Sequence, residues 1–414
     1  MYNFIQKFKD NGHSCTLLGI GPVSKSVIKA TFEAALKYSF PPVFIASRNQ
    51  VDLKSLGHGY LMGGMDQFDF VSTLKKIRNN VGYEGPLYIC RDHGGPWQRN
   101  IELDSKYSLA KAMGIARLSF KADIEAGFNY LHIDPTKCPH PFSQSDLCEW
   151  TVELVEYCEQ VRKQLGRGKI DYEVGTEDIQ DGLTTKEVFA HFLKELTGRL
   201  SESDLPNPVC IVGQTGTLTR LDRNVGRFDR RQTETLAEIA ATYNIGFKEH
   251  NGDYLGAADC SIHPEIGVTG VNMAPEFGLV ETDGYLFLAD LENQAAEQGL
   301  LTTGESSGLK KLLIEKTFEI SPWRKWLTHD LKELPAAEVE DNGSLRLLIA
   351  RVCGHYVYDN PQVAAARDQL FKNSRRFNLV EDPERFVIEK LLRAIGFYVK
   401  HFSMEGVNRI VGRD

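Results

Sequence analysis

Short apolar runs alternate with longer amphipathic stretches over residues 1–295 of the chain. The apolar runs predict strands, at Thr16–Ile20, Val43–Ala46, Leu87–Cys90, Tyr130–Ile133, Asp171–Val174, Val209–Val212, Gly246–Lys248 and Gly267–Val271. The stretches between them have the helical period, at Lys25–Tyr38, Gln67–Val81, Lys106–Ala126, Ser145–Gln164, Thr185–Leu196, Arg230–Tyr243 and Pro275–Gln298. A strand that is followed by a helix and another strand indicates βαβ units in a parallel sheet.

Eight such units favour an α/β fold of the (β/α)8 type, the TIM barrel. The alternative is a doubly wound open sheet. No Gly-x-Gly-x-x-Gly motif closes the first turn, because Gly19-Ile20-Gly21-Pro22 is too short a match. Dinucleotide binding is therefore disfavoured.

The pattern changes after about residue 300, where strand alternation is no longer visible. Helical stretches are predicted at Pro361–Phe371 and Asp382–Ala394, with a further one at Gly396–Phe402. The Gly- and Ser/Thr-containing segment Leu301–Ser307 predicts the boundary. We therefore expect a barrel domain over residues 1–299 and a mainly helical extension over residues 300–414, which packs on the barrel or serves as an oligomer arm.

Composition excludes several classes of protein. The 414 residues carry a formal charge of −8, whereas nucleic-acid-binding proteins usually carry a basic excess. No run of 18 apolar residues occurs, and the N-terminal segment is too polar for a signal peptide. The eight cysteines form no Cys-x-x-Cys motif, which suggests reduced thiols and a cytoplasmic protein.

Polar side chains follow nearly every predicted strand. They include Ser47–Gln50, Arg91–His93, His132 with Asp134, Glu173–Asp178, Gly213–Thr215, Glu249–Asp253 and Gly270–Asn272. In a TIM barrel the carboxyl ends of the strands share one mouth, where the active site lies. The pattern predicts a site at that mouth.

His93, His250 and Glu177 are the candidate metal ligands, because imidazole and carboxylate together suit Zn²⁺ or a similar divalent ion. Gln214 could supply a weaker oxygen ligand or contact substrate. The alternative for each histidine is an ordinary loop or core residue. Ligands that come one from each strand leave no short-range spacing signal.

Asp92 and Asp134 are the candidate acid/base residues, because a carboxylate beside a metal can move the proton of a substrate hydroxyl. The alternative role is to orient metal-binding histidines. For Asp134 we favour the direct role.

A glycine-rich loop over residues 57–65 follows Asn49 and Gln50. It could be a lid over the site or a structural Ω-loop. An arginine-rich segment over residues 220–231 could bind an anion such as a sugar phosphate, or form a solvated face. The remaining candidates for contact with substrate are Asn49, Gln50, Asn251, Asp253, Asn272 and Arg376.

At these motifs the sequence resembles the tagatose-bisphosphate aldolase family, specifically its Z-type subunit. The matching segments are Asn49-Gln50-Val51 with Gly63-Gly64-Met65, Asp92-His93-Gly94-Gly95-Pro96, His132-Ile133-Asp134, Tyr172–Glu177, Glu249–Tyr254 and Lys372–Arg376. The resemblance spans most of the chain and implies a TIM barrel with a helical extension. It is similar, more distantly, to metal-dependent class II aldolases.

By that resemblance Asp92 is the proton carrier, His93 and His250 bind metal, and Glu177 is a ligand or an acid/base. Two departures stand out. Gln214 replaces a metal-binding histidine, and Asn251-Gly252-Asp253 replaces a small phosphate cradle. An acidic Asp253 is expected to repel phosphate.

The resemblance implies two alternative functions. One is a Zn²⁺-dependent enzyme that cleaves a ketose or ketose phosphate by retro-aldol chemistry, or epimerises it at C4. The other is a non-catalytic subunit that stabilises a separate aldolase subunit. We also expect a homo-oligomer, with no nucleic-acid or membrane partner.

Overall fold

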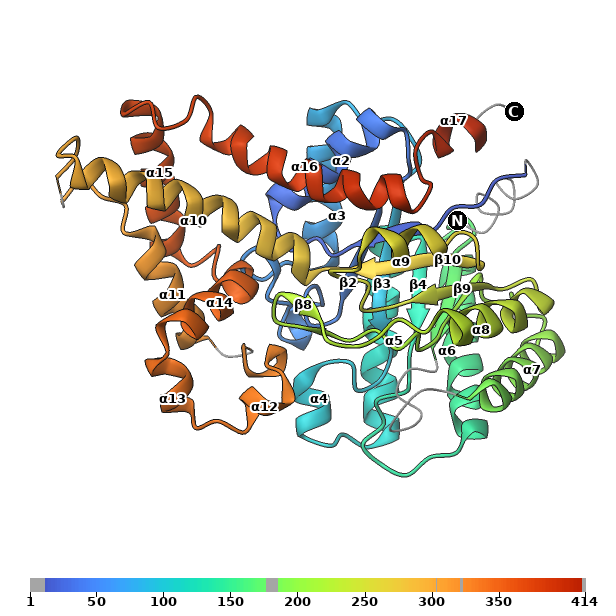
Figure 1. Cartoon of the computed structure of the whole chain (residues 1–414). Helices are drawn as coiled ribbons and strands as arrows, with labels where there is room; N and C mark the ends of the chain where they lie inside the picture. The colour runs from blue at the N-terminus through green and yellow to red at the C-terminus, as the bar shows by residue number, and fades with distance from the viewer. Residues whose placement is uncertain (1–11, 176–184, 303, 321–322, 412–414) are drawn as a thin grey trace.

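The computed structural model describes residues 12–175, 185–302, 304–320 and 323–411. Eight parallel strands close into a barrel in the order β1-β10-β9-β6-β5-β4-β3-β2, which confirms the predicted TIM barrel (Figure 1). The strands are β1 (Leu17–Ile20), β2 (Val43–Ser47), β3 (Tyr88–Gly94), β4 (Tyr130–Ile133), β5 (Asp171–Gly175), β6 (Cys210–Val212), β9 (Gly246–Glu249) and β10 (Val268–Met273).

Helices connect successive strands around the outside of the barrel. They are α2 (Lys25–Tyr38), α3 (Gln67–Val81), α4 (Asn100–Asp104), α5 (Leu109–Ala126), α6 (Gln144–Gln164), α7 (Lys186–Glu202), α8 (Arg230–Thr242), α9 (Ala257–Ile262) and α10 (Pro275–Glu297). Local signals set several of their ends. Ser24 caps α2 by accepting the Val27 amide, and Gly82 ends α3 in the left-handed region at φ 76°.

The arginine-rich segment contains a short hairpin that the apolar pattern did not predict. Its strands are β7 (Thr219–Arg220) and β8 (Arg223–Asn224), which pair antiparallel outside the barrel sheet. Strands of two residues carry no readable alternation, so tertiary contacts decide them.

Much of the helical extension lies on the left of Figure 1, and its last two helices run across the top over the barrel. It contains α11 (Leu309–Glu319), η3 (Trp323–Trp326), α12 (His329–Lys332), α13 (Ala336–Asp341), α14 (Gly343–Cys353), η4 (Gly354–Tyr356), α15 (Pro361–Arg376), α16 (Pro383–His401) and α17 (Val407–Val411). The two stretches predicted around residue 395 form one helix, α16. Gly396 permits its close approach to α2, because a Cβ there would lie 2.7 Å from the Tyr38 hydroxyl oxygen.

The last helices share the barrel's core. Leu391, Ile395 and Tyr398 of α16 are buried in the same hydrophobic cluster as the strands and α2. The domain boundary near residue 300 therefore stays a prediction, since α16 returns to the barrel (Figure 1).

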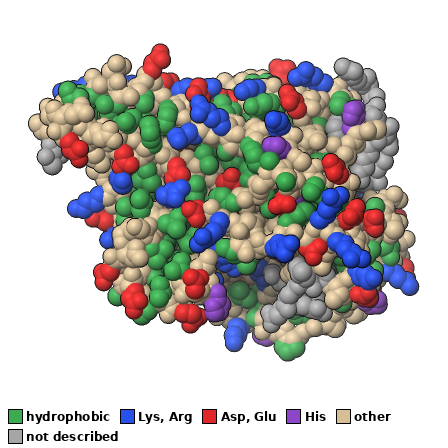
Figure 2. Space-filling view, in the orientation of Figure 1, with side chains coloured by type: hydrophobic (Ala, Val, Ile, Leu, Met, Phe, Trp, Pro, Cys, Tyr) green, Lys and Arg blue, Asp and Glu red, His purple; other side chains and the backbone are tan. Residues whose placement is uncertain are grey.

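Three features of the structure bear on the classes of protein that the composition disfavours. No helix in the described ranges is long and apolar enough to cross a membrane. All eight cysteines are free, and all but Cys138 are buried. Acidic and basic side chains are interspersed over the coloured part of the face seen in Figure 2.

Candidate metal centre and active site

The strand register brings polar side chains together at the carboxyl end of the barrel. Ser47 of β2 pairs with Asp92 of β3, and His132 of β4 pairs with Glu173 of β5. The side chains that converge there are Asp92, His93, His132, Asp134, Glu173, Lys248, His250 and Asn272. Polar side chains therefore meet at the mouth of the barrel where the sequence pattern predicted a site.

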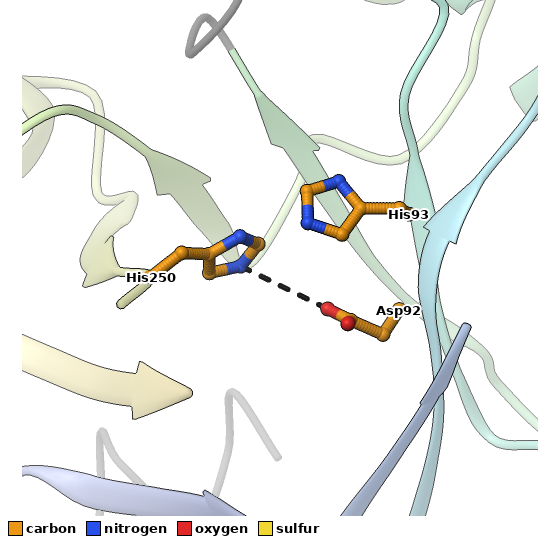
Figure 3. A group of neighbouring side chains, drawn as sticks. All are labelled: Asp92, His93 and His250. Atoms are coloured by element: carbon orange, nitrogen blue, oxygen red, sulfur yellow. Dashed lines mark ion pairs between the residues drawn. The ribbon is translucent and has the colours of Figure 1, made fainter. Parts of the chain in front are cut away.

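Three imidazole rings form the centre of this group. The ring centroids of His93 and His250 are 4.8 Å apart, those of His93 and His132 are 5.2 Å apart, and those of His132 and His250 are 5.5 Å apart. Figure 3 shows His93 and His250 pointing toward each other from opposite sides, with Asp92 beside them. His132 is 1% exposed, so its ring is enclosed within the barrel.

Glu173 lies beneath the rings and is fully buried. Its Oε2 atom accepts hydrogen bonds from the Tyr130 hydroxyl and from Lys248 Nζ, the latter at 2.7 Å. Burial by itself raises the pKa of Glu173, but the Lys248 ammonium, His132 and His250 together outweigh burial and hold that pKa well below its usual value. Glu173 is therefore an anion whose second oxygen, Oε1, faces the histidines.

Two ring nitrogens lie close to Glu173 Oε1. His132 Nδ1 accepts the backbone N–H of His93 at 3.3 Å, and His250 Nε2, depending on its tautomer, either accepts from Asn272 Nδ2 at 3.0 Å or donates to Glu173 Oε1. These nitrogens lie 3.5 Å and 3.2 Å from Glu173 Oε1. Two ring nitrogens and a carboxylate oxygen thus lie close to one another in a buried place, and such a group could hold a metal ion.

This donor set fits a divalent metal ion. Ligand atoms around a tetrahedral zinc ion at its usual bond lengths are about 3.4 Å apart, which is close to both separations. Burial lowers the pKa of His132, and a neutral ring is what a metal ligand requires. His132, Glu173 and His250 could hold a metal, as could Asp92, His93 and His250.

Asp134 orients His93. Its Oδ2 atom lies 2.6 Å from His93 Nδ1, while its Oδ1 atom accepts from the Thr136 amide and hydroxyl. Burial raises the pKa of Asp134, but the hydrogen bond from His93 and the nearby charges of His132, His93 and Lys137 together outweigh burial and hold the pKa far below its usual value. A His93 ring that donates Nδ1–H to this carboxylate leaves Nε2 available to a metal.

The backbone at the end of β3 has a tightly constrained conformation. His93 has a φ of 45°, and Gly95 has a φ of 131°. A Cβ at Gly95 would lie 2.7 Å from the Asp134 carbonyl oxygen, so a side chain there would push the two strand ends apart. The buried Arg48 donates from Nη1 to the Gly95 carbonyl at 2.7 Å and so holds this turn.

Asp92 is the most accessible carboxylate of the group, with 15% of its side chain exposed. It accepts from Asn272 Nδ2 at 2.8 Å and lies 3.9 Å from His250 Nε2 (Figure 3). Burial raises its pKa, but the His93 and His250 rings and the Lys248 ammonium, with a further effect from His132, together outweigh burial and hold the pKa below its ordinary value. Asp92 is therefore an ionised carboxylate whose side chain is partly exposed.

The other predicted substrate contacts lie at different places. Asn272 lies in the centre itself. Gln214 follows β6 and is half-buried, and Asn251 is exposed, with its carbonyl accepting from Thr219 and Asn224. Arg376 is 62% exposed and pairs with Glu305, both in the extension.

Asp253 caps a helix. Its Oδ1 atom accepts the amides of Ala274 and Glu276 at the start of α10, at 3.1 Å and 2.9 Å. Burial, with a further effect from the neighbouring Glu276, raises the pKa of Asp253 to about 8. Asp253 is therefore mainly uncharged at neutral pH, which weakens the expectation that it repels phosphate.

Asn49 and Gln50 begin a loop that folds back on itself. The Tyr60 amide donates to the Asn49 carbonyl at 3.0 Å, and the Leu61 amide donates to the Gln50 carbonyl at 3.1 Å. Gln50 Oε1 also accepts the Ser47 amide at 2.9 Å. These backbone hydrogen bonds hold the two ends of the loop together, which favours the Ω-loop alternative over a lid.

Glu177 lies outside the described residues, so its predicted role stays a prediction. Sequence reasoning assigned no role to His132, Glu173 or Lys248. His132 and Glu173 belong to the strand-end pattern, which could have marked them. Lys248 lies inside a predicted strand, and a charged residue within a buried strand was the signal for it.

Three solved structures resemble the fold. A probable tagatose 6 phosphate kinase from Sinorhizobium meliloti 1021 matches with a TM-score of 0.74 and 18% identity over 93% of this chain and 100% of its own. The fructuronate-tagaturonate epimerase from Cohnella laeviribosi matches at 0.56 with 11% identity, over 94% and 82%. The fructose-bisphosphate aldolase from Campylobacter jejuni matches at 0.55 with 12% identity, over 98% and 93%.

At these identities the structural matches show the fold alone. No curated protein matches the chain in sequence. A family description of the D-tagatose-1,6-bisphosphate aldolase subunit, GatZ/KbaZ-like, matches residues 1–383. The chain therefore belongs to the GatZ/KbaZ-like family of D-tagatose-1,6-bisphosphate aldolase subunits.

Proposed function

We propose that the chain is a metal-dependent carbohydrate enzyme that cleaves, or epimerises at C4, a ketose or ketose phosphate by retro-aldol chemistry. The observation that carries this proposal is the buried group of His132, Glu173 and His250, in which the two ring nitrogens lie 3.5 Å and 3.2 Å from Glu173 Oε1. A scaffold has no need of such an arrangement at the mouth of a barrel.

The proposed ligands are His93, His132 and His250, with Glu173 as the anionic partner. Zn²⁺ suits this set of nitrogen and carboxylate donors. When bound, the ion supplies Lewis-acid polarisation of the ketose carbonyl. Asp134 orients His93, and Lys248 holds Glu173 in its ionised form.

Asp92 is the proposed base. It removes the proton of the hydroxyl on the carbon β to the carbonyl, and the electron pair of that O–H bond forms an aldehyde as the C3–C4 bond breaks. The C3–C4 pair moves toward the C2 carbonyl and leaves an enediolate. Asn272 holds Asp92 in place through the 2.8 Å hydrogen bond.

The same residues serve two outcomes. Separation of the fragments gives an aldolase. Rotation of the aldehyde fragment and its re-addition to the other face gives an epimerase at C4. The family description and the epimerase-like fold support the class of chemistry, and an assay with several ketoses decides between the outcomes.

The test uses the full chain, purified alone. Metal content is measured, and turnover of D-tagatose 1,6-bisphosphate and of unphosphorylated ketoses is followed before and after chelation. We expect bound metal and turnover that chelation abolishes and Zn²⁺ restores. Turnover that survives complete removal of metal would contradict the proposal.

The second candidate function is a subunit that stabilises a separate catalytic aldolase, because the family is described as a subunit. Absence of metal and turnover in the isolated chain, together with tight binding to a class II aldolase, would establish it. The cytoplasmic location and the homo-oligomer stay predictions.

A further inference from the structure

A cavity of about 320 Å³ lies between the loop after β2 and the helical extension. The barrel side contributes Asn49, Tyr60 and Asn100, and the extension contributes Lys325 and Tyr356. No Asp or Glu is among the residues that line it. The cavity therefore offers amides, hydroxyls and one ammonium group to a ligand.

This cavity is linked to the candidate metal centre by hydrogen bonds. Asn49 lies two residues beyond Ser47, which pairs with Asp92 across β2 and β3. Asn49 Nδ2 donates to the Gln98 carbonyl at 3.1 Å, and Gln98 Nε2 donates to the Asp134 carbonyl at 2.8 Å. Hydrogen bonds through Gln98 thus connect Asn49, which lines the cavity, to the Asp134–His93 pair.

The extension is anchored over this end of the barrel. The rings of Tyr60 and Tyr356 lie 4.7 Å apart between centroids, and Trp326 Nε1 donates to the Tyr356 hydroxyl at 3.3 Å. The Trp326 carbonyl accepts the Leu221 amide of the β7–β8 hairpin at 2.9 Å. The segment around Trp326 is therefore tied to loops that follow two different barrel strands.

Lys325 is a cation without an acidic partner among the residues that the structure describes. Its Nζ atom lies 5.0 Å from the ring centroid of Trp326 and 5.5 Å from that of Tyr356, which places the ammonium over two aromatic faces. By contrast, Arg375 and Arg376 pair with Glu384 and Glu305. Lys325 is thus available to an anion while those arginines are engaged.

We propose that this cavity binds the anionic end group, phosphate or carboxylate, of an open-chain ketose whose carbonyl end lies at the candidate metal centre. Lys325 pairs with the anion, and Asn49 and Asn100 contact hydroxyls along the chain. The inference rests on the proposed function. It provides a protein of net negative charge with a local cation, Lys325, for an anionic substrate.

The test is calorimetric binding to the full chain supplied with Zn²⁺. The probes are D-tagatose 6-phosphate, D-tagaturonate and neutral D-tagatose. We expect Lys325→Met to weaken binding of at least one anionic ketose about tenfold, and Lys325→Arg to restore most of it. Binding of D-tagatose stays unchanged, and the control Lys332→Met, an exposed lysine of the same extension, has no effect.

Loss of affinity for only one of the two anionic probes identifies the end group. Two results would overturn the inference: equal affinity of Lys325→Met and wild type for both anionic ketoses, or wild-type binding of them no tighter than that of D-tagatose. Because binding is measured without turnover, a chain that shows these differences but has no activity refutes the proposed reaction and leaves the binding site standing.

Discussion

His93 Nδ1 lies 2.6 Å from Asp134 Oδ2, and Asp134 is held in turn by Thr136. We expect Asp134→Asn to weaken metal binding by about 10- to 100-fold, because the ring of His93 loses its orienting anion. Metal titration of the apo chain measures this, with the exposed Asp104→Asn as the control. Lost turnover with unchanged metal affinity would instead assign Asp134 the direct acid/base role.

Asp92 is partly exposed and is hydrogen-bonded to Asn272. We expect Asp92→Asn to keep bound metal and to lower kcat by at least about 100-fold, since the amide cannot accept the substrate proton. Elemental analysis and steady-state kinetics on the same preparation check both parts. Loss of the metal would show that Asp92 is a ligand or orients one.

Lys248 and Glu173 form a buried ion pair at 2.7 Å. Lys248→Met leaves the carboxylate buried without its cation, so we expect a loss of about 3–5 kcal/mol in the free energy of unfolding. Urea unfolding of the apo chain measures it, with Lys332→Met as the control. The double variant with Glu173→Gln should lose less than the sum of the two single losses, and simple additivity would contradict this coupling.

Asp253 contributes a pH dependence to stability. Its pKa is raised to about 8 in the folded chain, whereas the unfolded carboxyl titrates near 3.8. Between these values the folded state binds more protons, so the contribution of Asp253 to stability falls as pH rises, by at most about 1.4 kcal/mol per pH unit.

Asp253→Asn removes this titration while its side-chain oxygen can still accept the α10 amides. We expect a smaller loss of unfolding free energy between pH 5 and pH 8 in Asp253→Asn than in wild type. Urea unfolding at several pH values checks this, again beside Asp104→Asn. Parallel pH profiles for wild type and Asp253→Asn would contradict it.

The barrel was readable from the sequence because each strand and helix carries its own local signal. Short apolar runs marked all eight barrel strands to within a few residues, and helices such as α2 and α3 matched their predicted bounds. The β7–β8 hairpin carries only a weak local signal and was not predicted. The sequence pattern also predicted two helices on either side of residue 395, whereas in the structure Gly396 packs against Tyr38 within one continuous helix, α16.

By itself, the sequence determined the alternation of strands and helices, and the phase of that alternation put polar residues at one mouth. Only the tertiary structure decided which of them meet. It brought His132, Glu173 and Lys248 together with His93 and His250, and it placed Asp253 on a helix end and Arg376 on the extension. The physical reason is that distances, lone-pair directions and burial depend on barrel closure and register, which join residues far apart along the chain.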